Sequence, residues 1–211
     1  ENAQLRISHV ATSATGSFFR ITWQGVVLDE ASLNVPGRHN VLNATAALAA
    51  GLALGLNPNQ LIRGLSKFQG VRRRFELKGK VRDIRVFDDY AHHPAELAAL
   101  ISGVRSLYSN QKLTLVFQPH LFSRTQDLCD GFADSLSAAD EVVLLPIYPA
   151  RELPIPGVTS EMIVHKMTHK NVVLLEKEAV SDWVKKQQPK LLVMAGAGDI
   201  DVLIRNIKND L

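Results

Sequence analysis

The sequence predicts an α/β protein with two parts, residues 1–70 and 71–211. In the second part, short apolar runs alternate with stretches of helical periodicity. That alternation is typical of a mostly parallel sheet covered by helices on both faces. The first part instead shows short strand-like stretches followed by two helix-like ones. The run FQGVRRR at residues 68–74 contains a glycine and three arginines and is the expected linker.

The first part is expected to be β-rich with two helices. Its strands are expected at residues 4–10, 17–23, 26–28 and 30–35. Alanine and leucine then recur at helical spacing over residues 40–54, and Gly55 is a plausible end for that helix. A second helix is expected to run to about Lys67, with Asn57 as its N-cap and Pro58 as its first residue.

The second part is expected to form a Rossmann-like domain. Its strands are expected at residues 74–78, 83–88, 113–117, 141–145, 172–175 and 191–195. Its helices are expected at residues 94–108, 125–138, 160–168, 179–187 and 200–207. Gly79 is expected in the turn between the first two strands. The remaining strands are joined by helices, which is the pattern of parallel strands with right-handed crossovers.

Composition excludes several classes of protein. Hydrophobic residues make up 46% of the 211 residues, which is enough for a sizeable core. No run approaches eighteen apolar residues, so no membrane-spanning helix is expected, and no signal peptide is visible. The net charge of +3 is too small to indicate a nucleic-acid partner. The single cysteine, Cys129, excludes an internal disulfide and fits a reducing, cytoplasmic compartment.

Polar side chains gather where two predicted strands end. The run DDYAHHP at residues 88–94 follows one strand, and QPHLFSRT at residues 118–125 follows another. Ligands of open α/β sheets bind at the carboxyl ends of the strands, so these loops are the best candidates for a site, and we expect them to converge into a single pocket. Simple helix capping is the alternative for each, but it does not account for this density of phenol, imidazole and guanidinium groups.

Three further patterns are less specific. The GAGD run at residues 196–199 lacks the third glycine of a dinucleotide fingerprint, so a tight strand–helix turn explains it better. Asn40 and Asn43 share one face of a helical turn and suit the edge of a purine, although Asn40 could equally be an N-cap. The histidines of the two polar loops suggest a metal site only weakly, because adjacent histidines rarely provide zinc geometry.

These motifs together resemble the Mur ligase family. GRHNVLNATAALA resembles a helix motif of that family, and FQGVRRRFE resembles its domain junction. DDYAHHPAE, FQPHLFSRT and IYPARELPIPGV are similar to the branch that joins L-alanine to UDP-N-acetylmuramate, and the final AGAGDI also fits. The matches run in order from about residue 36 to residue 200.

The resemblance implies a C-terminal portion of a three-domain enzyme. The family's G-x-x-G-K-T phosphate loop does not occur in the chain, so we expect a longer protein of which residues 1–70 end the central ATPase domain. Residues 71–211 would then be the C-terminal Rossmann-like domain. The implied reactants are ATP, UDP-N-acetylmuramate and L-alanine, with Mg²⁺ held mainly outside this chain. Without the missing domains, the first seventy residues are expected to expose an apolar face and to self-associate.

The resemblance also implies a nucleotide site. The residues implied to bind ATP are His39, Asn40, Asn43, Arg73, Arg74 and Asp89. The first three would lie by the adenine. Arg74 would reach the γ-phosphate, Arg73 would lie beside the nucleotide, and Asp89 would approach the ribose.

An amino-acid site is implied as well. The residues implied to face the alanine are Tyr90, His92, His120 and Arg124, with Arg124 the best partner for its carboxylate. Together with Arg74 and Asp89, His92 is a candidate catalytic residue. Many family members carry arginine where this chain has Leu121, which leaves more of the carboxylate binding to Arg124.

Three alternatives remain open at this point. A sister enzyme of the same family reattaches recycled murein peptides, although the second polar loop favours a single alanine. A nicotinamide-binding oxidoreductase domain would need a G-x-G-x-x-G run after the first strand of the α/β domain, which is absent. A non-catalytic nucleotide-binding domain is the third, and the isolated chain is expected to turn over no ATP.

Overall fold

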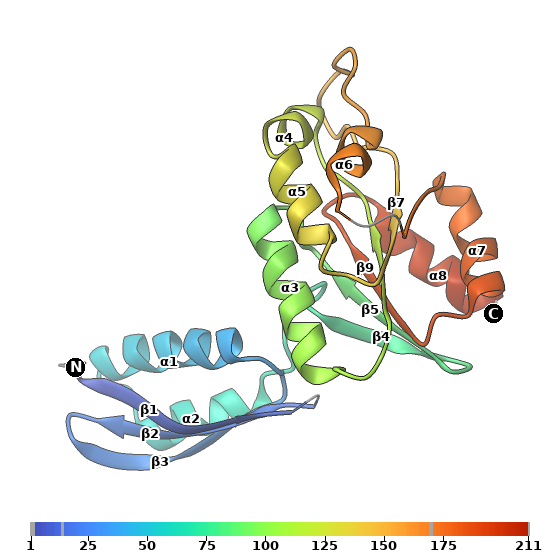
Figure 1. The fold of residues 1–211 in the computed structure, drawn as a ribbon. Coiled ribbons are helices and arrows are strands. Elements are labelled where there is room, and N and C mark those ends of the chain that lie inside the picture. The colour runs from blue at the N-terminus through green and yellow to red at the C-terminus, as the bar shows by residue number, and fades with distance from the viewer. Residues whose placement is uncertain (1–2, 14, 169–170, 211) are drawn as a thin grey trace. The chain divides into compact units, whose positions relative to one another are not determined.

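The computed structural model describes residues 3–13, 15–168 and 171–210. The chain forms two compact units, Glu1–Val71 and Arg72–Leu211. Figure 1 shows the two units and the labels of their elements.

The first unit is a three-stranded antiparallel sheet with two helices. The strands β1 (Leu5–Thr12), β2 (Ser17–Trp23) and β3 (Val26–Leu33) lie in that order in the sheet. The helices α1 (Arg38–Ala53) and α2 (Pro58–Lys67) share a small core with it. The two stretches expected at residues 26–28 and 30–35 are one strand, because an irregularity opposite Ile21 and Thr22 lets β3 continue.

The two helices of the first unit begin in different ways. Asn57 caps α2 as predicted, since its side chain accepts hydrogen bonds from the N–H groups of Asn59 and Gln60. The first helix has Gly37 as its N-cap, and Asn40 lies inside the helix.

The second unit confirms the predicted α/β class with a mostly parallel sheet. Its six strands lie in the order β4-β5-β9-β6-β7-β8, and only the β4–β5 pair is antiparallel. The strands are β4 (Glu76–Val81), β5 (Ile84–Asp89), β6 (Leu113–Phe117), β7 (Glu141–Leu144), β8 (Val172–Leu174) and β9 (Leu191–Ala195). Every residue of β6 and β9 is buried, which explains their continuous apolar sequence.

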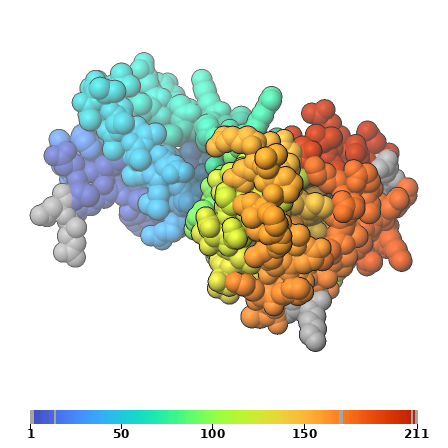
Figure 2. Space-filling view, turned by 90° about the horizontal axis from the view of Figure 1, so that it is seen from above, coloured from blue at the N-terminus to red at the C-terminus, as the bar shows by residue number. Residues whose placement is uncertain are grey.

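Helices cover both faces of this sheet. The helices α3 (Pro94–Leu107), α5 (Cys129–Leu136) and α6 (Glu161–Lys166) pack on one face, and α7 (Val180–Gln187) and α8 (Ile200–Asp210) on the other. A 3-10 turn, Lys177–Ala179, leads into α7. In Figure 2 the yellow and orange segments, which hold α5 and α6, lie side by side at the surface.

Two predictions about this unit were wrong. Gly79 is not in a turn but inside β4 opposite Val86, next to an irregularity in the ladder, and the hairpin turn is at Arg82 and Asp83. The single helix expected at residues 125–138 is two helices, α4 (Phe122–Asp127) and α5, which meet at Leu128. Leu128 has backbone angles of −112° and 18°, and it packs against the core beneath α5.

Candidate functional site

The carboxyl ends of β5, β9 and β6 form one edge of the sheet. These three strands are neighbours and run parallel, so the loops that follow them lie together. The first loop holds the tyrosine–histidine run, the second holds the histidine–arginine run, and the third is the GAGD run. The predicted convergence of the first two loops is therefore present in the structure.

Four aromatic rings form a row along this edge. The ring centroids of Tyr90 and His92 are 5.1 Å apart, and those of His92 and His120 are 6.2 Å apart. The ring of His120 stacks in turn on Tyr148 at 5.6 Å, from the loop after β7. His92 and His120 therefore meet although another strand separates β5 from β6.

His92 is held in one orientation by oxygen acceptors. Its Nδ1 lies 2.8 Å from the carbonyl oxygen of Tyr90 and 3.2 Å from Oε2 of Glu96. The same Glu96 oxygen accepts the backbone N–H of His92 at 2.9 Å. Two acceptors face Nδ1, so in the neutral ring the hydrogen is assigned to Nδ1 and Nε2 carries the lone pair.

The two aspartates at the end of β5 are both buried and have different partners. Asp89 accepts the N–H groups of Phe75 and Ala91, each at 2.7 Å, so both of its oxygens hold the backbone. Asp88 is 0% exposed and lies 3.5 Å from Nε of Arg73 and 3.6 Å from Nζ of Lys78. Burial raises the pKa of both carboxyl groups, against the opposing effect of these partners.

Arg73 binds the GAGD loop. Its guanidinium donates to the carbonyl oxygens of Gly196 at 2.6 Å and Gly198 at 3.3 Å. It also lies 3.8 Å from Asp201 and 5.1 Å from the centre of the Tyr90 ring. Two of its three nitrogens are thus hydrogen-bonded within the unit, whereas the buried Nε has no hydrogen-bond partner among the described residues.

Arg74 is much less engaged than Arg73. Its side chain is 49% exposed, and its closest carboxylate is Glu96 at 3.8 Å. The guanidinium also lies 5.8 Å from the centre of the Tyr90 ring. Of the two arginines, Arg74 is the one free to bind a phosphate.

The GAGD loop packs against the end of β6 rather than opening toward solvent. A Cβ on Gly198 would lie 2.6 Å from Oε1 of Gln118 and 2.7 Å from Cγ of Tyr148. Asp199 accepts Gln118 Nε2 at 3.1 Å and Lys177 Nζ at 2.6 and 2.8 Å. Close packing thus explains the glycine at position 198, in agreement with the prediction of a tight turn.

The second loop holds three polar atoms that are buried and unpartnered within the described part of the chain. These are Oε1 of Gln118, Nδ1 of His120 and Nη1 of Arg124. The pKa of the His120 imidazole is lowered, first by burial and then by the nearby charges of Arg124, His92 and Arg151. The loop is therefore a cationic environment in which a neutral His120 is favoured.

Sequence reasoning missed the segment after β7. Tyr148 pairs with His120 as an isolated parallel bridge, and its N–H donates to the carbonyl oxygen of Pro119 at 2.8 Å. Glu152 accepts the hydroxyl of Ser123 at 2.5 Å and its N–H at 3.0 Å, which fixes this segment to the start of α4. The resemblance of IYPARELPIPGV to a family motif was the signal available in the sequence.

The residues predicted to contact adenine lie in the first unit. His39 and Asn43 are exposed on the first turns of α1. Asn40 is partly buried, and its side-chain amide donates to the carbonyl oxygen of Pro36 at 2.7 Å. That bond uses one of the two amide N–H donors, so the side-chain oxygen and the second N–H are left for a ligand.

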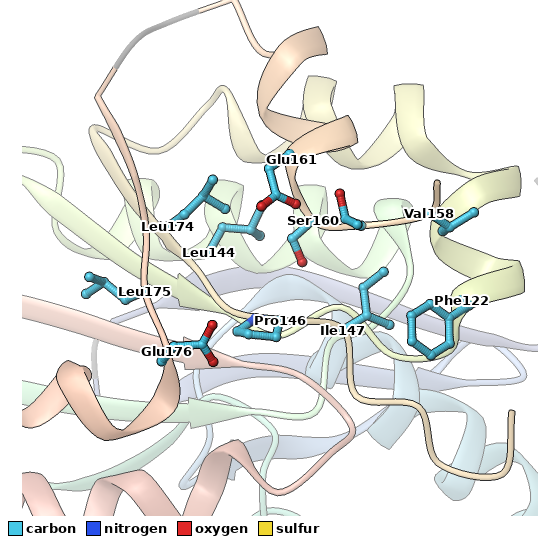
Figure 3. A pocket seen from close by; sticks show the side chains of 11 residues that line it. Phe122, Leu144, Pro146, Ile147, Val158, Ser160, Glu161, Leu174, Leu175 and Glu176 are labelled. Atoms are coloured by element: carbon cyan, nitrogen blue, oxygen red, sulfur yellow. The ribbon is translucent and has the colours of Figure 1, made fainter. Parts of the chain in front are cut away.

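An apolar pocket lies beside the loop cluster, which consists of the two polar loops and the segment after β7. It has a volume of about 390 Å³ and lies at the carboxyl ends of β7 and β8 (Figure 3). Its wall consists mainly of aliphatic side chains, with Glu161 and Glu176 at its polar side. Phe122 is the one residue of the second polar loop that lines this pocket. The candidate site is therefore the loop cluster, where the charged groups converge, and not this pocket.

Two observations concern metals and membranes. Among the described residues, no group of three or more histidine, cysteine, aspartate or glutamate side chains is arranged to hold a metal ion. None of the helices in the described ranges combines the length and apolar character that crossing a bilayer requires.

Comparisons with known proteins agree with this geometry. A family model described as "Mur ligase, glutamate ligase domain" matches residues 73–200. A UDP-N-acetylmuramate–L-alanine ligase of Christiangramia forsetii is 40% identical over all 211 residues, which cover 47% of that protein. The chain spans about half the length of the curated relatives it matches.

Solved structures have the same fold. The crystal structure of the UDP-N-acetylmuramate–alanine ligase of Thermotoga maritima gives a TM-score of 0.81 at 28% identity, over 99% of this chain and 46% of that one. A murein peptide ligase of Psychrobacter arcticus gives 0.69 at 22% identity, over 99% of this chain and 44% of that one, and this likeness concerns the fold alone.

Proposed function

This chain belongs to the Mur ligase family, and on that premise we propose that it is the C-terminal portion of an ATP-dependent ligase that joins L-alanine to UDP-N-acetylmuramate. The relatives with this name that are about 40% identical over the whole chain support the reaction. We further propose that the first unit ends the central ATP-binding domain and that the second is the complete C-terminal domain.

The approach of His92 to His120 carries this proposal. Their ring centroids are 6.2 Å apart, so the two polar loops form one site at the carboxyl edge of the sheet. Beside it lie the unpartnered donors of His120 and Arg124. A small zwitterion suits such a site, because its carboxylate can satisfy the cations while its amine approaches an imidazole.

The proposed reaction has two steps. The carboxylate of UDP-N-acetylmuramate takes the γ-phosphoryl group of ATP and ADP leaves. The amine of alanine, after losing a proton, then attacks the acyl phosphate and inorganic phosphate leaves. Holding the amine beside the activated carbonyl makes this second step effectively intramolecular.

The residues of this chain have separate roles in the proposal. Arg124 binds the alanine carboxylate, and Nε2 of His92 accepts a proton from the alanine ammonium group. Tyr90 and His120 line the same pocket. Arg74, half exposed, offers its guanidinium to a phosphate. Asp89 accepts hydrogen bonds from the backbone N–H groups of Phe75 and Ala91, so it is a positioning residue for the first polar loop.

The proposed nucleotide contacts differ in how available they are. His39 and Asn43 are exposed, and with Asn40 they are proposed to bind adenine. Arg73 contributes beside the nucleotide mainly by fixing the GAGD loop. We propose that the Mg²⁺ that would neutralise phosphoryl charge is held mainly by residues of the enzyme outside this chain.

The test uses the full-length protein. With ATP and UDP-N-acetylmuramate, we expect ADP release that depends on L-alanine and a product heavier by one alanyl residue. The isolated 211-residue chain should release none. Preference for a tripeptide over L-alanine would favour the murein-peptide alternative, and alanine-dependent phosphate release by the isolated chain would contradict the proposed division of the enzyme.

Self-association and location complete the proposal. Exposed apolar side chains at the first unit, including Phe18, Val26 and Val27, would favour association of the isolated chain. Sedimentation of the 211-residue chain over a range of concentrations tests this, and a monomer at all of them would contradict it. The nucleotide substrates indicate a cytoplasmic enzyme, which fractionation of cells with an antibody against this chain would check.

A further inference from the structure

The loop cluster contains more positive charge than its own carboxylates neutralise. Within the described ranges, Nη1 of Arg124 has no hydrogen-bond partner, and Arg151 is exposed, with Glu152 as a carboxylate on which its charge acts. Nη1 of Arg124 is nevertheless buried, as is the unpartnered Nδ1 of His120. Buried donors without acceptors are costly, so an anionic ligand is the natural partner for this cluster.

The chain after β7 brings Arg151 to this cluster. The backbone of Tyr148 is bonded to that of the second loop on both sides, since its N–H donates to Pro119 and its carbonyl oxygen accepts the N–H of Leu121. Four residues later, Glu152 accepts hydrogen bonds from Ser123 at the start of α4. Arg151 lies between these two attachments, and its charge acts on His120.

The neighbouring carboxylate, Glu152, uses its hydrogen bonds elsewhere, although the charge of Arg151 also acts on it. Both oxygens of Glu152 accept hydrogen bonds from Ser123, one from the hydroxyl and one from the backbone N–H. The backbone bond also supplies an acceptor for the first turn of α4, because the N-cap residue Leu121 has no side-chain oxygen. Glu152 therefore fixes the segment through Ser123, and the Arg151 side chain is exposed to solvent.

We propose that Arg151 binds the carboxylate of the amino-acid substrate together with Arg124. This inference rests on the proposed function. Because Leu121 carries no charge, Arg151 is the second cation that binds the carboxylate beside Arg124. Two guanidinium groups from different loops can grip the two oxygens of one carboxylate in a fixed plane. The same cations would suit a phosphate, so the experiment separates the two anions.

The test compares Arg151→Ala and Arg151→Lys in the full-length enzyme, with Arg205→Ala as a matched control. Arg205 is exposed on α8 and has no place in the proposed site. For Arg151→Ala we expect the KM for L-alanine to rise about ten-fold, with kcat and the KM for ATP within two-fold. Arg151→Lys should recover most of this loss because it keeps the charge.

A second substrate isolates the carboxylate. L-alaninamide lacks it, so any use of this analogue should be equally weak in the wild type and in Arg151→Ala. An unchanged KM for L-alanine in Arg151→Ala would overturn the inference, and a rise in the KM for ATP alone would assign Arg151 to a phosphate instead. If the wild-type enzyme shows no alanine-dependent ADP release, it is the proposed function that fails.

Discussion

The guanidinium of Arg73 donates a 2.6 Å hydrogen bond to the carbonyl oxygen of Gly196, 123 residues further along the chain. It also donates to Gly198 and faces the buried Asp88. One side chain thus joins the segment before β4 to the loop after β9 and offsets a buried carboxylate. Arg73 is therefore expected to contribute to folding as well as to any nucleotide contact.

Replacing Arg73 by alanine should destabilise the protein by about 3 kcal/mol, because Asp88 would keep its place in the interior without its nearest cation. Urea denaturation of the 211-residue chain measures this. The double variant Arg73→Ala with Asp88→Asn should be more stable than Arg73→Ala alone, since it removes a buried charge that would retain only Lys78 as a nearby cation. Equal stability of Arg73→Ala and the wild type would mean that Arg73 acts on the ligand only.

Gly198→Ala should displace the aromatic row. The new methyl group would meet Oε1 of Gln118 and the ring of Tyr148 at less than van der Waals distance. We expect a loss of about 2 kcal/mol in stability and a higher KM for L-alanine, because Tyr148 stacks on His120. Gly103→Ala is the control: nothing lies within 4 Å of its new Cβ, so it should stabilise α3 by about 0.5 kcal/mol. Similar effects from both variants would contradict this explanation.

His92→Ala should lower kcat about 100-fold in the full-length enzyme, as expected for loss of a proton acceptor. The neighbouring His93 provides the control, because its Nδ1 only accepts the N–H of Ala95 and caps α3. Asparagine is an equally good N-cap, so His93→Asn should keep both stability and kcat. A comparable loss of kcat in the two variants would contradict the proposed role of His92 as the proton acceptor.

Asp140 makes stability depend on pH. The Arg105 guanidinium, 2.7 Å away, is the main cause that lowers the pKa of this carboxyl below its ordinary value of 3.8. The stabilisation is therefore present above pH 3.8 and is lost as the pH falls further. Asp140→Asn should cost about 1 kcal/mol at pH 7, since water screens this half-exposed pair, and progressively less as the pH falls below 3.8 through the lowered pKa of Asp140.

Denaturation of the wild type and Asp140→Asn across this pH range checks the sign. Asp130→Asn is the control, because Asp130 and Lys166 form an ion pair in which Asp130 is 82% exposed. That variant should leave the stability nearly unchanged at every pH. A difference between wild type and Asp140→Asn that grows toward acid would contradict the assignment.

Local patterns predicted most elements of the second unit because its buried strands are short apolar runs between helices. The two errors had tertiary causes. Glycine often indicates a turn, but Gly79 lies within β4, next to an irregularity in its pairing with β5. Helical periodicity continues through Leu128, yet the chain leaves the helix there and α5 packs beside α3 and α6.

The sequence by itself determined the α/β class, the order of the strands and helices along the chain and the resemblance to Mur ligases, because periodicity and motif order are local properties. It also indicated that the loops of His92 and His120 would meet, since parallel neighbouring strands end at one edge of a sheet. Only the tertiary structure decided which polar groups are already used and which remain free. Asp89 and Arg73 bind backbone groups of other segments, while Nη1 of Arg124 has no hydrogen-bond partner among the described residues. Hydrogen-bond partners depend on how distant segments pack, and that information is absent from any single stretch of sequence.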